Sequence, residues 1–216
     1  MLQMICAAFL FVTLAACSSY KGTGVAVPQA GRLPFQTTVG SVSISADPYV
    51  TEDRQKAIFD GKLYEKGIVA IHLVVQNSGE RRLLVRRSDM LLVLPNGMAI
   101  ATASPALVAE KFNSRGDIRA WTLGFGIVGG LIASANAEEE RAARKADYQN
   151  KEFKEETTLI RDDAAHGFLY FVVPPHPDPF DQATLSIKVV DVQDGAASVI
   201  VVPLTNLKFP GGPKSS

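Results

Sequence analysis

The chain has 216 residues, enough for one sizeable hydrophobic core, and 47% of them are hydrophobic. Its 22 basic side chains balance its 22 acidic side chains, so the formal net charge at pH 7 is zero. This balance excludes a global electrostatic signal for nucleic acid binding or for steering toward an anionic surface.

An apolar run of ten residues, from Ile5 to Leu14, stands near the start of the chain. Such a run fits the core of a signal peptide and is too short to span a bilayer, which needs about 20 residues. It ends in Leu14-Ala15-Ala16-Cys17, which resembles the lipobox of bacterial lipoproteins, where a Leu and two small residues precede an obligatory Cys. The chain departs from that pattern in one respect, because no Lys or Arg precedes the apolar run.

The lipobox resemblance implies that residues 1–16 are a lipoprotein signal peptide, cleaved between Ala16 and Cys17. It also implies that Cys17 carries a diacylglyceryl thioether and an acylated amine. In a host with two membranes, Ser19 implies the outer membrane, with the protein facing the periplasm. Because Cys6 leaves with the signal peptide, the mature chain then has no cysteine for a disulfide, a thiolate metal site or a nucleophile.

Residues 17–34 are rich in Ser, Gly and Pro and show no periodicity, which predicts a lipidated flexible tether. A folded domain is expected over residues 35–208, followed by a disordered tail at residues 209–216.

Strand signals dominate this domain. Val42, Ile44 and Ala46 alternate with serines, which is the period-two pattern of a half-buried strand. Further strands are predicted, in chain order, over residues 67–76, 83–85, 90–94, 98–101 and 164–174, and as a pair within 183–204. The predicted turns between strands are Asn77-Ser78-Gly79, Pro95-Asn96-Gly97 and Asp194-Gly195.

Seven or eight short strands with turn signals every 8–12 residues suggest an antiparallel sandwich. The layout resembles the immunoglobulin-like domains of uncharacterised bacterial envelope lipoproteins. The segments that carry this resemblance are residues 74–97, a Gly/Ala-rich helical stretch, residues 157–171 and a closing hairpin. It implies a mainly β fold, an immunoglobulin-like antiparallel β-sandwich with a helical insert at about residues 104–157, and no known activity.

The insert is expected to have three parts. Ser104 and Pro105 begin a short helix over residues 104–112. An apolar run follows over residues 121–137, and residues 138–156 form a charged helix with a solvated surface. Two favourable pairs at i,i+4 spacing are expected on that helix: Glu140 with Arg144, and Asp147 with Lys151.

Small residues recur every four positions in the apolar run. They form two rows, Gly126-Gly130-Ser134 and Gly129-Ala133-Ala137. Rows of this kind permit close helix contacts and resemble a glycine zipper, which implies helix association or membrane insertion. Three alternatives stay open: the run packs on its own domain, associates with another copy or a partner, or inserts into or lies on lipid.

The sequence shows no catalytic motif, and we expect neither an enzyme nor a cofactor or metal site. His72 is interpreted as a packed strand residue, and His166, after Asp162 and Asp163, as part of a polar turn rather than a cation ligand. His176 lies in a proline-rich turn. Gly124, Gly126 and Gly129 fit a dinucleotide-binding pattern, but no βαβ unit surrounds them.

Four arginines, Arg81, Arg82, Arg86 and Arg87, flank one predicted strand. They are interpreted as its solvated ends, with contact to anionic lipid or lipopolysaccharide as the alternative. The tripeptide Arg115-Gly116-Asp117 matches an integrin-type motif, a match that short sequences reach by chance.

Together these features predict a lipid-anchored cell-envelope protein with a non-enzymatic binding or structural role. The alternative is oligomerisation or membrane contact through the glycine-zipper residues 121–137. The expected partners are the membrane, through lipid on Cys17, and a protein or second copy through the insert, with no nucleic acid.

Overall fold

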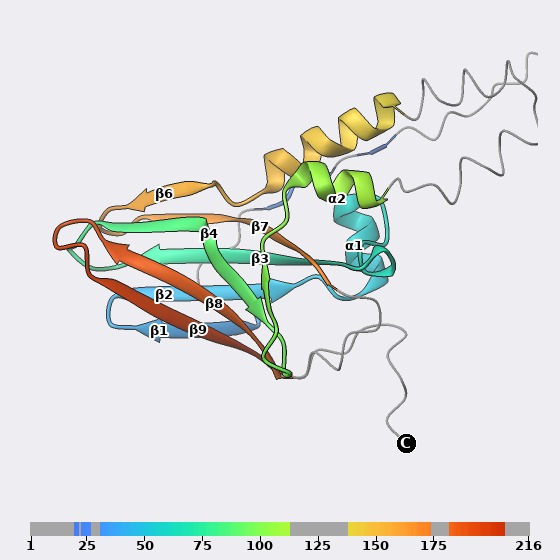
Figure 1. Cartoon of the computed structure of the whole chain (residues 1–216). Helices are drawn as coiled ribbons and strands as arrows, with labels where there is room; N and C mark the ends of the chain where they lie inside the picture. Colours follow the sequence, from blue (N-terminus) through green and yellow to red (C-terminus); the bar gives the residue numbers. More distant parts are fainter. Residues whose placement is uncertain (1–19, 22, 27–30, 113–137, 174–181, 206–216) are drawn as a thin grey trace, which may run out of the picture.

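The computed structural model describes residues 20–21, 23–26, 31–112, 138–173 and 182–205. Two antiparallel sheets lie face to face, and helices pack at one end of the molecule against the outer face of one of them (Figure 1). Within the described residues the strands are β1 (Phe35–Val39), β2 (Val42–Pro48), β3 (Ile68–Asn77), β4 (Leu83–Val93), β5 (Ala99–Ala101), β6 (Glu156–Leu159), β7 (Ala164–Val172), β8 (Gln182–Asp191) and β9 (Ala197–Thr205). The helices are α1 (Glu52–Phe59), a 3-10 turn (Tyr64–Lys66), α2 (Pro105–Phe112) and a helix over residues 138–151.

The expected mainly β sandwich with a helical insert is confirmed. The first sheet has the strand order β1-β2-β3-β7, and the second has the order β5-β4-β8-β9 with β6 also paired to β4. Strands β2, β3 and β7 therefore take the places of strands A, B and E of an immunoglobulin domain, and β4, β8 and β9 those of C, F and G.

Aliphatic side chains fill the space between the sheets. The alternation predicted for β2 is confirmed, since Val42, Ile44 and Ala46 are buried in this core. Leu73 from β3 and Ile187 from β8 are fully buried there as well. Burial of apolar area at about 25 cal/mol per Å² makes this the main source of stability for the sandwich.

Two strands that were predicted separately form one continuous strand, β4. Residues 83–85 and 90–94 were expected to be separate, but β4 runs through both. Its pairing with β8 is irregular between Val85 and Met90, where a bulge accommodates the polar residues that interrupt the apolar pattern. Two strands pair with different parts of β4 along the same edge: β6 pairs with Leu83–Arg86, and β5 pairs with Leu91–Val93.

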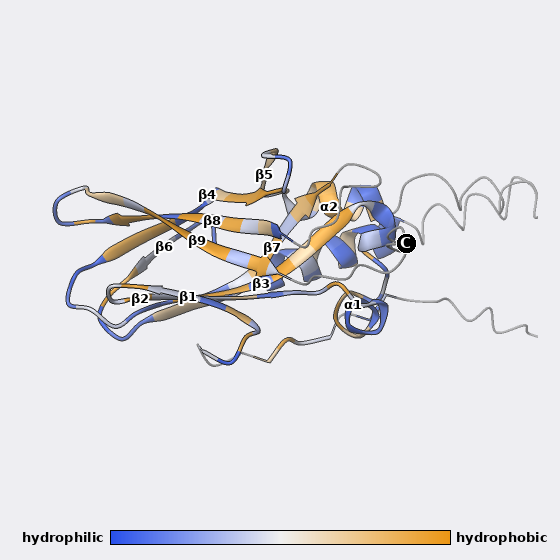
Figure 2. Cartoon of the chain, turned by 90° about the horizontal axis from the view of Figure 1, so that it is seen from below, coloured by the Kyte–Doolittle hydropathy of each residue, from blue (hydrophilic) through white to orange (hydrophobic). Residues whose placement is uncertain are grey.

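The helical segments were predicted in part. The helix expected over residues 104–112 is α2, and its Ser104 hydroxyl accepts a bond from the Leu107 amide at 3.3 Å. The charged helix ends at Lys151, and the next element, β6, was not predicted. The helix α1 was also missed, because it is mostly hydrophilic (Figure 2) and only Gln55 and Phe59 of its residues are buried. No helix in the described part of the chain is long and apolar enough to cross a bilayer.

Candidate functional site

A second core lies on the outer face of the first sheet, under the helices. Residues of β7 alternate between the two cores: Leu169 and Phe171 point into the sandwich, while Phe168 and Tyr170 point outward. Phe59 of α1 is at the centre of the outer set. Its ring lies 4.9 Å from the ring of Phe168, 5.8 Å from that of Tyr148 and 6.1 Å from that of Tyr170. These edge-to-face contacts fix α1 and the 138–151 helix on the sheet.

Polar contacts orient α1 on β2. The two guanidinium nitrogens of Arg54 donate to the two carboxylate oxygens of Asp47 at 3.0 and 2.5 Å, and the guanidinium lies 4.0 Å from the Tyr49 ring centre. The buried amide of Gln55 donates to the Tyr49 carbonyl at 2.8 Å and accepts from the Tyr64 amide at 3.0 Å. All the polar atoms of the Gln55 side chain that face the core thus have partners.

His72 belongs to this layer and packs as expected. Its ring is buried and stacks on Phe168 at 4.6 Å, and the ring of exposed His166 lies 6.0 Å away. Burial, with a smaller contribution from the His166 charge, lowers the pKa of His72 to about 4. His72 is therefore neutral at pH 7. No group of three or more metal-binding side chains occurs among the described residues, and His176 lies outside them.

Two basic side chains of the 138–151 helix are buried against α1. The predicted pairs are confirmed, since Arg144 lies 2.9 Å from Glu140 and Lys151 lies 2.5 Å from Asp147. The predicted solvated surface is wrong for these basic residues, because their side chains are only 4% and 6% exposed.

The buried basic groups also bind the end of α1. Arg144 donates to the carbonyl of Phe59 at 3.3 Å, and Lys151 donates to the carbonyl of Ile58 at 2.6 Å. Helix-terminal carbonyls lack partners within their own helix and favour nearby cations. The charges of the 138–151 helix therefore cap the C-terminus of α1, which gives them a structural reason to be buried.

Tyr20 attaches the N-terminal segment to this charged cluster. Its hydroxyl donates to Asp147 at 2.5 Å, its ring lies 4.5 Å from the Arg144 guanidinium, and it meets Tyr148 edge-on at 6.4 Å. The next residue, Lys21, donates its amide to Asp60 at 3.2 Å. Burial and the bond to Asp147 raise the pKa of Tyr20 above its ordinary value, so its hydroxyl remains a donor at neutral pH.

Other described residues of the predicted tether also contact the domain. Val25 packs against the second core, the Gly31 amide donates to Ser45 at 3.2 Å, and Leu33 is buried. These residues are held on the outer face of the first sheet, where a flexible connection was expected.

Arg144 also meets the end of α2. Its guanidinium lies 4.0 Å from the ring centre of Phe112, the last described residue before the gap at residues 113–137. The same ring covers Gly61, where an added Cβ would come within 2.1 Å of it. Arg144 is six residues from position 138, about 9 Å along a helix axis. Three described chain ends, at residues 20, 112 and 138, therefore lie close to one side chain.

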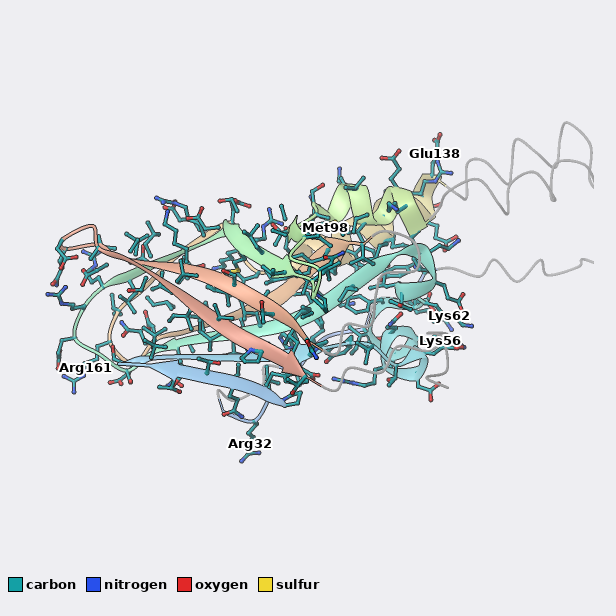
Figure 3. All side chains as sticks on the ribbon, turned by 60° about the horizontal axis from the view of Figure 1, so that its bottom comes forward. Arg32, Lys56, Lys62, Met98, Glu138 and Arg161 are labelled. Atoms are coloured by element: carbon teal, nitrogen blue, oxygen red, sulfur yellow. The ribbon has the colours of Figure 1, made fainter. Side chains whose placement is uncertain are left out.

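We call this part of the molecule the helical end; it comprises α1, residues 60–66, the end of α2 and the first turns of the 138–151 helix. Figure 3 shows Lys56, Lys62 and Glu138 there, and Arg161 at the opposite end of the molecule. At the helical end, hydrogen bonds, cation–π contacts and ring packing hold together the segments that contain Tyr20, Phe112 and Arg144.

The arginine cluster is largely neutralised by carboxylates. Arg81 pairs with Asp191 and Asp194, and Arg86 pairs with Glu156 at 2.8 Å. Arg87 pairs with Glu152 and Glu155. Because carboxylates already pair with three of the four guanidinium groups, the alternative of contact with anionic lipid has less support for Arg81, Arg86 and Arg87.

The sequence-predicted site residues lie outside the described part of the chain. They are Ala16, Cys17, Gly126, Gly129, Gly130, Ala133, Ser134 and Ala137, and Arg115-Gly116-Asp117 lies outside it too. Sequence reasoning missed Tyr20, Phe59 and the buried role of Arg144. A usable signal was present, because Arg144, Tyr148 and Lys151 lie at i, i+4 and i+7 and so share one helix face.

Comparisons with known proteins add little. No family model and no curated protein matches the chain. The yjhA protein of Bacillus subtilis has a TM-score of 0.37 at 12% identity, with 77% of this chain and 95% of that one covered. A functionally unknown protein of Listeria monocytogenes has a TM-score of 0.39 at 9% identity, with 87% and 90% covered. Likeness at this level carries no weight for fold or function.

Proposed function

We propose that this chain is a lipid-anchored cell-envelope protein with a non-enzymatic binding or structural role. The lipid is attached at Cys17, in the Leu14-Ala15-Ala16-Cys17 sequence, and the sandwich is presented in the periplasm from the outer membrane. The observation that supports an anchored role best is the attachment of Tyr20 to Arg144 and Asp147, three residues after the lipobox cysteine. Because the domain binds its own chain only three residues after the lipidated cysteine, it would keep a fixed position at the membrane.

The described site also supports a role in contact rather than catalysis. Its charged groups are engaged in capping α1 and in pairing with one another. A hydrolytic or transfer site needs a nucleophile or base within reach of a substrate, whereas His72 at this site is buried and stacked on Phe168.

The anchor is tested by expressing the full chain and the Cys17→Ala variant in a bacterial host. Intact mass should show diacylglycerol and an acyl chain on an N-terminal Cys17, and the protein should fractionate with the outer membrane. The Cys17→Ala variant should lack the added mass and leave the membrane fraction. A mature wild-type chain without the lipid mass would contradict the proposal.

A second candidate is glycine-zipper association or membrane contact through residues 121–137. The observation that favours it is that Phe112 and the 138–151 helix, the described parts on either side of residues 113–137, meet at Arg144 and lie at the same end as Tyr20. Size-exclusion chromatography with light scattering on detergent-purified protein tests it. A defined oligomer that Gly126→Leu with Gly130→Leu converts to a monomer would support it, and a monomeric wild type would oppose association.

A further inference from the structure

The position of Tyr20 determines how the domain stands on its membrane. We propose that the helical end faces the lipid head groups and that the opposite end of the sandwich, near Arg161, points away from the bilayer. This inference rests on the proposed lipid at Cys17 and adds the orientation of the domain and the surface that meets the lipid.

The short chain between Cys17 and Tyr20 limits how far the domain can lie from the lipid. Tyr20 is the third residue after Cys17, and three extended residues span at most about 11 Å. A free coil over the 17 residues from Cys17 to Pro34 would instead give a mean separation of about 23 Å and would leave the domain free to turn. The contacts of Tyr20 with Asp147 and Arg144 therefore shorten the connection to about half of that distance.

The thickness of the head-group layer determines the depth at which Tyr20 lies. A diacylglyceryl group on Cys17 places that residue at the boundary of the acyl chains, and the head-group layer extends about 5–7 Å beyond it. Tyr20, at most about 11 Å from Cys17, then lies within or just above the head groups. Its neighbours at the helical end, Phe112 and the Asp60 carboxylate that accepts from Lys21, lie at the same level.

The charges of the helical end show which force holds it there. Lys56 lies 2.6 Å from Glu52, and Lys62 lies 2.9 Å from both Glu52 and Glu65. These lysines are paired, so they offer little net attraction to anionic lipid. The lipid and the Tyr20 contacts provide the orientation, and it should persist when salt screens surface charges.

A depth measurement tests the orientation. Cys6 leaves with the signal peptide and the Cys17 sulfur is consumed by the lipid, so an introduced cysteine carries the only free thiol. Lys56→Cys at the helical end and Arg161→Cys at the opposite end are matched positions, with side chains 53% and 60% exposed. Each variant of the full lipidated chain is labelled with a small fluorophore and reconstituted into phosphatidylcholine–phosphatidylglycerol vesicles that contain a head-group nitroxide lipid.

We expect the label at position 56 to be quenched at least threefold more strongly than the label at position 161, at both 0.1 M and 1 M NaCl. Adding Tyr20→Ala should reduce the difference between the two values, because the contacts of Lys21 and Val25 then hold the domain on a longer connection. Tyr20→Phe keeps the ring over Arg144 and loses only the bond to Asp147, so it should retain most of the difference.

Equal quenching at the two positions in a protein with lipid on Cys17 would overturn the orientation and leave the proposed function standing. Absence of lipid from Cys17 would overturn both. A difference in quenching that is undiminished in Tyr20→Ala, with an unchanged unfolding midpoint, would refute the positioning role of Tyr20.

Discussion

In the sheet β1-β2-β3-β7, strands β2 and β3 and the second half of β7 are buried on both faces, and different kinds of side chain cover the two faces. Toward the second sheet, aliphatic side chains such as Leu73 and Ile187 pack in an apolar core. Toward the helices, aromatic rings pack around Phe59, and buried Arg144 and Lys151 border them. The aliphatic face builds the sandwich, whereas the aromatic face holds the N-terminal segment at Tyr20 and the end of α2 at Phe112. A packed core and an attachment site are thus separated by one sheet.

The largest expected effects come from removing a large side chain on either face. Leu73→Ala and Phe59→Ala should each lower the free energy of unfolding by about 3–5 kcal/mol, because both side chains are fully buried. Hydrogen–deuterium exchange should separate them. Leu73→Ala should speed exchange across both sheets, and Phe59→Ala mainly in α1 and the 138–151 helix. Equal acceleration of β8 by Phe59→Ala would mean that the two faces form one cooperative unit.

A close backbone contact joins the two faces at Gly167. A Cβ added there would lie 2.5 Å from the backbone nitrogen and Cα of Phe153, where the chain passes from the helix into the sandwich core. Gly167→Ala should therefore destabilise the protein by about 3 kcal/mol in chemical denaturation, since backbone atoms cannot move aside locally. Gly24→Ala, which meets nothing within 4 Å, is the matched control, and a comparable loss in both variants would contradict this view.

Acid should weaken the aromatic face selectively through His72. Its pKa in the folded protein is about 4, against 6.5 for the free side chain, so the unfolded chain binds more protons between these values. The free energy of unfolding should therefore fall as the pH drops from 6.5 to 4, by about 3 kcal/mol more than in His72→Leu. Denaturation series at several pH values measure this. Parallel pH profiles for the two proteins would show that Asp47 offsets the cost that burial, Arg54 and His166 place on charging His72.

The smallest expected effect concerns the tie between α1 and β2. Arg54→Lys should lower the free energy of unfolding by about 1 kcal/mol, because lysine can neither bind both oxygens of Asp47 nor stack its charge flat on Tyr49. Lys56→Arg, one turn away from the sheet contact and exposed, should leave the unfolding midpoint unchanged. An equally small change in both variants would show that ring packing alone holds α1.

Much of the sandwich could be predicted from short-range patterns. Alternation in β2, the Asn77-Ser78-Gly79 and Asp194-Gly195 turns and the hairpin at Pro95-Asn96-Gly97 are local signals, and β2, β8 and β9 follow them. Errors arose where a local signal was interrupted or weak. In the sequence, the polar residues at the bulge in β4 look like a turn between two strands. Helix α1 has too few apolar residues to show an apolar face at helical spacing.

The sequence by itself determined the aliphatic core, because successive side chains of a strand point to opposite faces. The alternation of apolar and polar residues therefore shows which face is buried without reference to a distant partner. It also determined the pairs Glu140–Arg144 and Asp147–Lys151, which are set by helix geometry. Only the tertiary structure decided that Arg144 is buried between Tyr20 and Phe112, which lie 124 and 32 residues before it in the chain. The reason is physical: those contacts join segments with no shared periodicity, and they form only when the sheet has brought α1, α2 and the N-terminal segment to the same end.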